Sequence, residues 1–442
     1  MARALETFEA DVARNPGDFE ARMRLGTACD ELDMHDEAIE NFEAAVRIRP
    51  KEVMPRSMLA EAYWHAGEID KSLETVREAL KIDPNDTDLR GIEGGLLAES
   101  GRYDEAISVL SQAIKANPDD AQLHISLADV LDATDDYEAA ISEYEKAEKL
   151  DPDDPDIKLR VAMSMIENDG FEGAALKLRE AIRLDDTDPE LYRALGSTLG
   201  LSEDYEGAIN AYRRALRLDP KDPELYAAIG EVYQDWGKPD DAIRAFTRAC
   251  KLAPYDFYML HDLSDLLIEN GRIEEAVKLY KDALKGEEDD PRAHMEFGEM
   301  LFEAGREEDG IREYREAIHL DPDETMLHVG LGNHLLDIGR HDEGLAEMQV
   351  AVRLKPDSLI AHSMLGKALL FNKQIDDAIA EFRMCVKIKP DAPGPHFSLS
   401  EAYEEKGMRK EAKKEGEEGE RLIKEQGFLL EEYLSLEGFL EK

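Results

Sequence analysis

Long apolar runs are missing from this sequence, and their absence excludes a whole class of proteins. A membrane-spanning helix needs about 20 consecutive apolar residues, and no such run occurs in the 442 residues, although 43% of them are hydrophobic. A secretory signal peptide would need an unbroken apolar stretch near the start, where Glu6, Glu9 and Asp11 stand instead. The sequence therefore predicts a soluble, cytoplasmic protein without membrane insertion.

Positive charge is scarce as well. The chain has 54 Lys and Arg residues against 101 Asp and Glu residues, which gives a formal net charge of −47. Such an acidic protein repels phosphate backbones and anionic lipid surfaces. We therefore expect its partners to be proteins or peptides, and not nucleic acid.

Signatures of catalysis and of bound cofactors are also lacking. The sequence contains no Gly-rich phosphate loop and no nucleophile elbow, and no strand pattern that would carry either. Its three cysteines, Cys29, Cys250 and Cys385, are far apart, whereas zinc and redox sites use close cysteine pairs. We expect three buried free thiols in a reducing compartment, no catalytic residue, no cofactor and no metal site.

What the sequence does contain is a repeat of 34 residues, which is the period of a unit of two helices. Proline returns in one phase over most of the chain, and only Asp186 and Glu288 interrupt the series. The prolines in this phase are Pro16, Pro50, Pro84, Pro118, Pro152, Pro220, Pro254, Pro322, Pro356 and Pro390.

Three further columns of the repeat predict how the helices pack. Two columns of small residues mark places where helices cross closely, because a larger side chain would push them apart. Between them lies a column of large residues that we expect to form the core. The first small column includes Ala38, Ala106, Ala140, Ala174, Ala208, Ala242, Ala276, Ala378 and Ala412; the second runs from Ala45 to Ala351; the large column is Phe42, Val76, Leu110, Tyr144, Leu178, Tyr212, Phe246, Tyr280, Tyr314, Met348 and Phe382.

Helix boundaries are signalled by glycine and aspartate. A glycine column fits the left-handed residue that closes a helix, and an aspartate column fits the residue that caps the next helix. The glycines are Gly67, Gly101, Gly237, Gly271, Gly305, Gly339 and Gly407, and the aspartates are Asp86, Asp120, Asp154, Asp188, Asp222, Asp256 and Asp290.

One unit shows the full pattern: Tyr226-x2-Ile229-Gly230-x2-Tyr233, followed by Ala242-x3-Phe246 and by Pro254. It resembles the tetratricopeptide repeat (TPR), with Tyr226 where the family pattern has Trp. The resemblance implies an all-α fold, a right-handed superhelical α-solenoid of about twelve repeats, in which the first helix of each unit forms the concave surface. The predicted segments are a half repeat at 1–18, the repeats 19–52, 53–86, 87–120, 121–154, 155–188, 189–222, 223–256, 257–290, 291–324, 325–358, 359–392 and 393–426, and an amphipathic capping helix at 427–442.

Two units depart from the pattern. In the third, Glu93 stands where other units have leucine, beside Gly91, Gly94 and Gly95; glycine lowers helix propensity, so we expect this helix to be the softest. In the last, Gly416 and Gly419 replace the aromatic and alanine positions, as is typical of a terminal repeat.

A column of histidines invites a metal interpretation. His124, His294, His328, His362 and His396 share one phase. Neighbouring helices pack about 8–10 Å apart, whereas zinc needs imidazole nitrogens at about 2.0–2.1 Å. We therefore expect each histidine to pack within its own repeat rather than to share an ion with the next.

The expected concave surface combines acids with apolar groups, which predicts a binding groove. Acids dominate one column of first-helix residues, and the surface becomes apolar from the eighth unit onward. The candidate groove residues are Glu231, Tyr258, Asp265, Met295, Glu299, Phe302 and Phe371. The alternative is that the apolar members pack against neighbouring first helices.

The sequence thus favours a non-catalytic scaffold or adaptor that binds a basic or amphipathic partner segment in its groove. Two alternatives remain. An accessory arm of a larger enzyme or glycosyltransferase-type assembly is kept open by the half repeat, because Leu5 and Phe8 would ordinarily pack on a preceding helix. A self-assembling structural or chaperone-like factor is kept open by the C-terminal amphipathic segment, through which the chain would self-associate.

Overall fold

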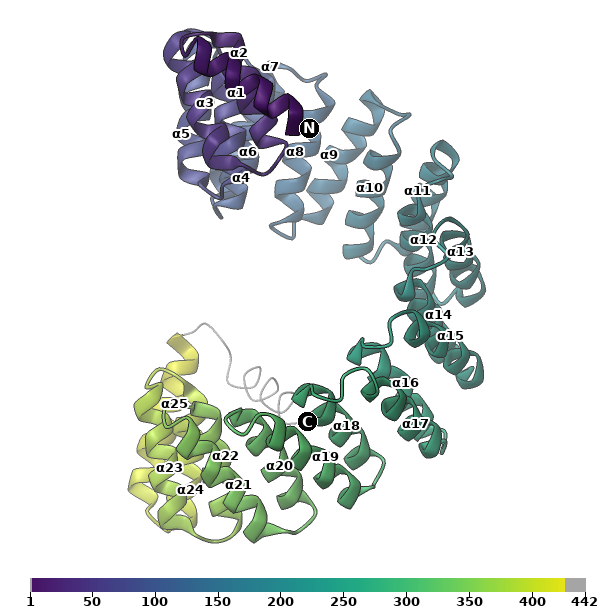
Figure 1. Cartoon of the computed structure of the whole chain (residues 1–442), viewed down its shortest axis with the longest axis vertical. Helices are drawn as coiled ribbons and strands as arrows, with labels where there is room; N and C mark the ends of the chain where they lie inside the picture. Colours follow the sequence, from purple (N-terminus) through teal and green to yellow (C-terminus); the bar gives the residue numbers. More distant parts are fainter. Residues whose placement is uncertain (1, 426–442) are drawn as a thin grey trace. The chain divides into compact units, whose positions relative to one another are not determined.

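The computed structural model of the chain describes residues 2–425, and these residues form 25 helices and no strand. The chain divides into two compact units, Met1–Gly237 and Lys238–Lys442. Figure 1 labels the helices of both units. The all-α repeat architecture predicted from the 34-residue period is confirmed.

The first unit contains helices α1 to α14, and the second contains α15 to α25. In the first unit they are α1 (Ala2–Arg14), α2 (Phe19–Asp30), α3 (His35–Ile48), α4 (Met54–His65), α5 (Ile69–Ile82), α6 (Thr87–Glu99), α7 (Tyr103–Ala116), α8 (Ala121–Asp132), α9 (Tyr137–Leu150), α10 (Pro155–Glu167), α11 (Phe171–Leu184), α12 (Pro189–Leu201), α13 (Tyr205–Leu218) and α14 (Pro223–Asp235). In the second they are α15 (Pro239–Leu252), α16 (Phe257–Glu269), α17 (Ile273–Leu284), α18 (Pro291–Glu303), α19 (Glu307–Leu320), α20 (Thr325–Asp337), α21 (His341–Leu354), α22 (Leu359–Phe371), α23 (Ile375–Ile388), α24 (Pro393–Glu405) and α25 (Arg409–Glu425).

Each helix packs mainly against its neighbours in the chain, as expected for a solenoid. A second set of contacts joins successive even-numbered helices, which are the first helices of the repeats. Such contacts join α2 to α4, α6 to α8, α10 to α12 and α12 to α14 in the first unit, and α16 to α18, α20 to α22 and α22 to α24 in the second. Within each unit the first helices therefore form a layer of their own, here called the first-helix layer.

The core is made of the residue columns expected from the sequence. The side chains of Phe42, Tyr144 and Phe382 are at most 2% exposed, and Ala38, Ala45 and Ala378 are completely buried. Close approach is required at several points: a Cβ added to Gly94 would lie 2.5 Å from Cγ of Leu110. Position 94 is a glycine because Leu110, in the large column of the same repeat, leaves no room for a side chain there.

The predicted helix boundaries are confirmed. Each glycine of the boundary column has a positive φ, from 69° at Gly305 to 81° at Gly339. Where a repeat has no glycine there, another residue takes the same left-handed conformation: Asp33, Asp135, Asp169, Glu203 and Lys373. The aspartate column caps the following helices, as when Asp86 Oδ1 accepts a hydrogen bond from the Leu89 N–H at 3.0 Å.

Helix α6 shows how a break in the pattern is compensated. Glu93 is buried at 4% exposure, and its carboxylate accepts hydrogen bonds from Arg77 at 2.8 Å and from Arg90 at 3.0 Å. The helix runs without interruption from Thr87 to Glu99. A buried carboxylate is tolerated because two guanidinium groups satisfy it. The expected softness of α6 stays a prediction.

Three remaining expectations concern the thiols, the membrane and the C-terminus. Cys29, Cys250 and Cys385 are buried and free, as expected, and burial raises the pKa of Cys250 and of Cys385 to about 12. Among the described residues, no helix is both long and apolar enough to cross a membrane. The predicted capping helix at 427–442 lies outside the described residues.

Candidate functional site

The first-helix layer of the second unit carries most of the predicted groove residues. Tyr258 lies in the first turn of α16 and is 79% exposed, and Phe371 ends α22 and is 68% exposed. Two more large apolar side chains on the same layer are open to solvent, Met326 at 47% and Ile360 at 53%. The ring of Phe371 lies near the ring of His341, with centroids 5.2 Å apart, but most of its surface and of the surface of Tyr258 is open to solvent. A partner that covers such a side chain lowers the free energy of the complex.

Met295 and Phe302 behave differently. Both are half-buried on α18 and pack against a core cluster that includes Ile311, Tyr314 and Leu331. The ring of Phe302 stacks on the ring of His334, with centroids 4.0 Å apart and planes at 7°. These two side chains therefore already pack against other residues of the unit, and only part of their surface is left for a binding partner to cover.

Glu299 is also engaged by its own unit. Its carboxylate accepts a hydrogen bond from the Tyr314 hydroxyl and lies 2.6 Å from Nε2 of His334. Burial alone would raise the pKa of Glu299, but the hydrogen bonds from His334 and Tyr314 outweigh it and hold the pKa below its usual range. Glu299 is thus an ionised carboxylate that orders the layer.

Asp265 belongs to a group of acids that do repel one another. Asp265, His261 and Glu303 each present an atom within 4.8 Å of the others. Burial, followed by the nearby charge of Asp265, raises the pKa of Glu303. Burial and then Asp265, partly opposed by His261, likewise raise the pKa of Asp262. A raised carboxyl pKa means that negative charge is held there at a cost in free energy, and a cation brought to this place would lower that cost.

Glu231, the remaining predicted groove residue, lies on α14 of the first unit and is exposed. The second unit places Tyr258 and Asp265 on α16 and Met295, Glu299 and Phe302 on α18, two helices that contact each other. Phe371 lies on α22, two first helices further along the layer. Sequence reasoning missed Glu303 and His261, although both lie on the same helices. The spacing between Glu299 and Glu303 could have revealed Glu303, because it falls one helical turn after Glu299 and so lies on the same helix face.

The histidine column is structural, as expected. His328 is 6% exposed; its Nδ1 lies 2.6 Å from Oε2 of Glu347 on the next helix, and its Nε2 lies 3.3 Å from the carbonyl of Pro322. His124, His294, His362 and His396 have the same two contacts, with Glu143, Glu313, Glu381 and Glu415 and with the carbonyls at 118, 288, 356 and 390. Each imidazole therefore joins the two helices of its own repeat to the preceding turn.

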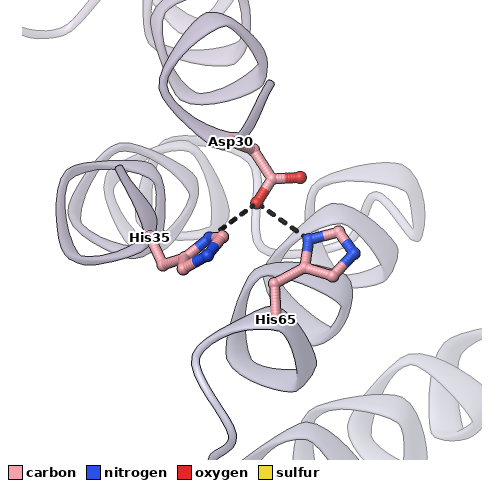
Figure 2. Close-up of side chains that lie close together, drawn as sticks. All are labelled: Asp30, His35 and His65. Atoms are coloured by element: carbon pink, nitrogen blue, oxygen red, sulfur yellow. Dashed lines mark hydrogen bonds and ion pairs between the residues drawn. The ribbon is translucent and has the colours of Figure 1, made fainter. Parts of the chain in front are cut away.

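A second group of side chains was not anticipated from the sequence. Asp30, His35 and His65 converge in the first unit from the ends of three different helices (Figure 2). The sequence does hold a signal for this group. His35 occupies the position at which other repeats place a large apolar residue, such as Tyr103 or Phe171, so an imidazole there is not explained by the core.

Comparison with protein families supports the repeat assignment. A model of the tetratricopeptide repeat matches residues 31–94, and a second model of that repeat matches residues 2–53 and 329–393. A model of the cilia and flagella-associated protein 70 C-terminal domain matches residues 88–300. A comparison with curated proteins found no match.

A comparison with solved structures found matches that include yeast Tom70, YrrB and a MamA protein. Yeast Tom70 is 17% identical, with a TM-score of 0.38, and the match covers 89% of this chain and 96% of that one. YrrB, described as a TPR protein with an unusual peptide-binding site, is 17% identical with a TM-score of 0.37, over 43% and 98% of the two chains. MamA from Desulfovibrio magneticus RS-1 is 20% identical with a TM-score of 0.34, over 38% and 96%. The peptide-binding site named in that description belongs to YrrB, and the match does not transfer it to this chain.

Proposed function

The chain is a tetratricopeptide-repeat protein, and from that premise we propose that it is a non-catalytic scaffold in a reducing, cytoplasmic compartment. Its second unit binds a partner segment that carries both basic and apolar side chains. The observation that carries the proposal is the combination found on one layer of helices. Tyr258 and Phe371 are exposed on the layer that also carries Asp262 and Glu303, two acids whose pKa is raised by burial and by the charge of Asp265.

The two kinds of group have different roles in the proposed complex. Covering one large apolar side chain stabilises a complex by about 1.5–3 kcal/mol, whereas an exposed ion pair contributes about 0–1 kcal/mol. Affinity therefore depends on Tyr258 and Phe371, and the acids around Asp265 select for a basic partner and orient it.

A pair of synthetic helical peptides tests this function directly. Both peptides carry the same leucines on one face, and the other face is lysine in one peptide and glutamate in its counterpart. We expect the full chain to bind the lysine peptide and not the glutamate peptide. Replacing Tyr258 and Phe371 with serine should weaken binding of the lysine peptide at least about tenfold, since about 1.4 kcal/mol corresponds to a factor of ten.

A matched control separates this site from general attraction by an acidic protein. Leu176, on α11 of the first unit, is 61% exposed, so Leu176→Ser removes a comparable exposed apolar group elsewhere. The control variant should bind like the unmodified chain. Equal weakening by Leu176→Ser, or no weakening by the Tyr258 and Phe371 substitutions, would show that the site is not on the first-helix layer of the second unit.

A further inference from the structure

Three metal-ligating side chains meet at one end of the first unit, away from the residues assigned above. Asp30 is the last residue of α2, His35 is the first residue of α3, and His65 is the last residue of α4. Both histidines turn their Nδ1 atoms toward the same carboxylate oxygen (Figure 2). Oδ1 of Asp30 lies 3.1 Å from Nδ1 of His65 and 3.6 Å from Nδ1 of His35.

Hydrogen bonding alone leaves one of these atoms unsatisfied. The distance of 3.1 Å to His65 is that of a hydrogen bond, whereas 3.6 Å is too long for one. Nδ1 of His35 is buried and has no hydrogen-bond partner among residues 2–425. Nearly all buried polar atoms in folded proteins are paired, and an exception needs an explanation such as a bound ion.

The separations match those between ligands of a tetrahedral metal ion. Zinc binds imidazole nitrogen and carboxylate oxygen at about 2.0–2.2 Å in tetrahedral geometry, which places neighbouring ligand atoms about 3.4 Å apart. The two measured distances of 3.1 Å and 3.6 Å lie on either side of that value. All three ligand atoms are within 4.8 Å of one another, so one ion can reach them with small side-chain rotations.

We propose that Asp30, His35 and His65 form a binding site for a divalent transition-metal ion, Zn²⁺, with three protein ligands and one open position. Two imidazoles and one carboxylate suit Zn²⁺, whereas Mg²⁺ and Ca²⁺ prefer oxygen ligands alone. Three protein ligands and a fourth, exchangeable one are the arrangement of an open zinc site.

The surroundings suit a cation with an exchangeable ligand. Asp30 and His65 end their helices, where the carboxyl end carries partial negative charge, while His35 begins α3, whose amino end is partly positive. Two of the three helix ends therefore favour a cation. A cavity of about 390 Å³ lies beside the site and is lined by His65, Glu61 and Trp64, among others. Glu61 lies one turn before His65 on α4, and therefore places a second carboxylate near the ion. The cavity leaves room for water or a partner's side chain at the open position.

A bound ion would join elements that belong to two successive repeats. α2 and α3 form one helix pair, and α4 begins the next. Because the ion binds the folded arrangement and not the separate helices, it stabilises this end of the first unit by mass action.

The experiment is calorimetric titration of the full, metal-free chain with Zn²⁺, in high salt with excess Mg²⁺ to suppress non-specific binding by the many acids. We expect one Zn²⁺ per chain and a raised melting temperature that EDTA reverses. His35→Tyr restores the residue type of Tyr103 and Tyr137 at that position, so it keeps the packing and removes one ligand. His35→Tyr and His65→Ala should each weaken Zn²⁺ binding more than about 100-fold, beyond the range typical of losing an outer-shell partner.

Two control variants make the assignment specific. His341 occupies the same repeat position as His35 and also has a buried Nδ1 without a hydrogen-bond partner, but it belongs to neither ligand cluster found among the described residues. His341→Ala should bind Zn²⁺ normally, and so should His261→Ala, which alters the other cluster. The proposal is wrong if the unmodified chain takes up no Zn²⁺, or if binding survives His35→Tyr and His65→Ala, or if it is lost with His261→Ala instead.

Discussion

Single residues decide where this repeat departs from its pattern, and Glu93 is the clearest case. It is a buried acid on a helix face where Leu25, Leu59 and Leu127 stand in other repeats. The structure explains its presence by Arg77 and Arg90, which are 41% and 35% exposed and reach in to pair with it. Arg90 falls one turn before Glu93 on the same helix, a spacing that the sequence does show. Arg77 lies on the preceding helix, and nothing in the linear pattern marks its contact with Glu93.

We expect Glu93→Ala and Glu93→Leu to differ in stability. The alanine variant leaves a void and two guanidinium groups without their carboxylate, which should lower the free energy of unfolding by about 1–3 kcal/mol. The leucine variant restores the apolar residue of the other repeats, and replacing a buried ion pair by a well-packed apolar group is often neutral or stabilising. Urea unfolding of both variants measures this. A leucine variant that is as unstable as the alanine variant, relative to the unmodified chain, would show that the ion pairs are needed.

His328 predicts a pH dependence of stability. The hydrogen bond to Glu347 raises the pKa of His328, against an opposing effect of burial, and the carbonyl of Pro322 adds to the rise. The unfolded value is about 6.5. Because the folded pKa is the higher one, the contribution is fully present below about pH 6.5 and is lost as the pH rises through the folded pKa.

The measurement is the difference in unfolding free energy between the unmodified chain and His328→Gln across this pH range. The difference should be largest at acidic pH and should shrink toward alkaline pH. His319, which is exposed on α19, supplies the control substitution His319→Gln. A difference for His328→Gln that stays constant with pH would contradict the protonated pairing.

At the scale of elements, the sequence predicted which helices exist and where they end better than it predicted which side chains are free to bind a partner. The proline, glycine and aspartate columns located the helices because each column has a local cause, such as the left-handed φ of 71° at Gly101. Whether a side chain is free to bind is not local. Phe302 and Glu299 were predicted as groove residues, and in the structure both contact His334 of the next repeat, a contact that depends on how two repeats stack.

Helix α6 allows a test of local stability with two neighbouring glycines. A Cβ at Gly95 would meet no atom of the described residues within 4 Å, whereas a Cβ at Gly94 would meet Leu110 at 2.5 Å. Gly95→Ala should therefore raise stability by about 0.5–1 kcal/mol, the usual gain for alanine over glycine within a helix. Gly94→Ala should lower it, because Leu110 or the helix must move.

Amide hydrogen exchange measures the local stability of each helix and so tests the effect of the glycines on α6. In the unmodified chain, α6 should exchange fastest among α4, α6, α8, α10 and α12, and Gly95→Ala should slow exchange within α6. Equal protection of these five helices would contradict the prediction that the glycines weaken α6.

At the scale of the whole molecule, the net charge of −47 complicates any claim about a particular acidic site. A field of that size attracts any cationic partner and raises its association rate wherever the acids lie. Binding kinetics distinguish a specific site from general electrostatic attraction. Electrostatic steering changes the association rate constant, whereas desolvated apolar contacts change the dissociation rate constant.

We therefore expect two kinds of substitution to change different rate constants. Phe371→Ala removes an exposed apolar anchor, so it should raise the dissociation rate constant of the lysine peptide about 10- to 100-fold at an unchanged association rate constant. Reversing Asp265 and Glu303 to lysine should mainly slow association and make it less dependent on salt. Glu299 is unsuitable for this purpose, because its loss would also break the hydrogen bond with Tyr314.

The control for the charge reversal keeps the change in net charge the same and moves it elsewhere. Glu172 on α11 and Glu206 on α13 are exposed acids on second helices of the first unit. Reversing both to lysine changes the net charge by the same amount as the Asp265 and Glu303 reversal. The effect of this control variant on the association rate constant therefore measures the contribution of net charge alone. Surface-plasmon kinetics at several salt concentrations should show a larger loss of association rate for the Asp265 and Glu303 variant. If both double variants slow association equally, the acids of the first-helix layer act only through net charge, and binding specificity must come from the apolar groups.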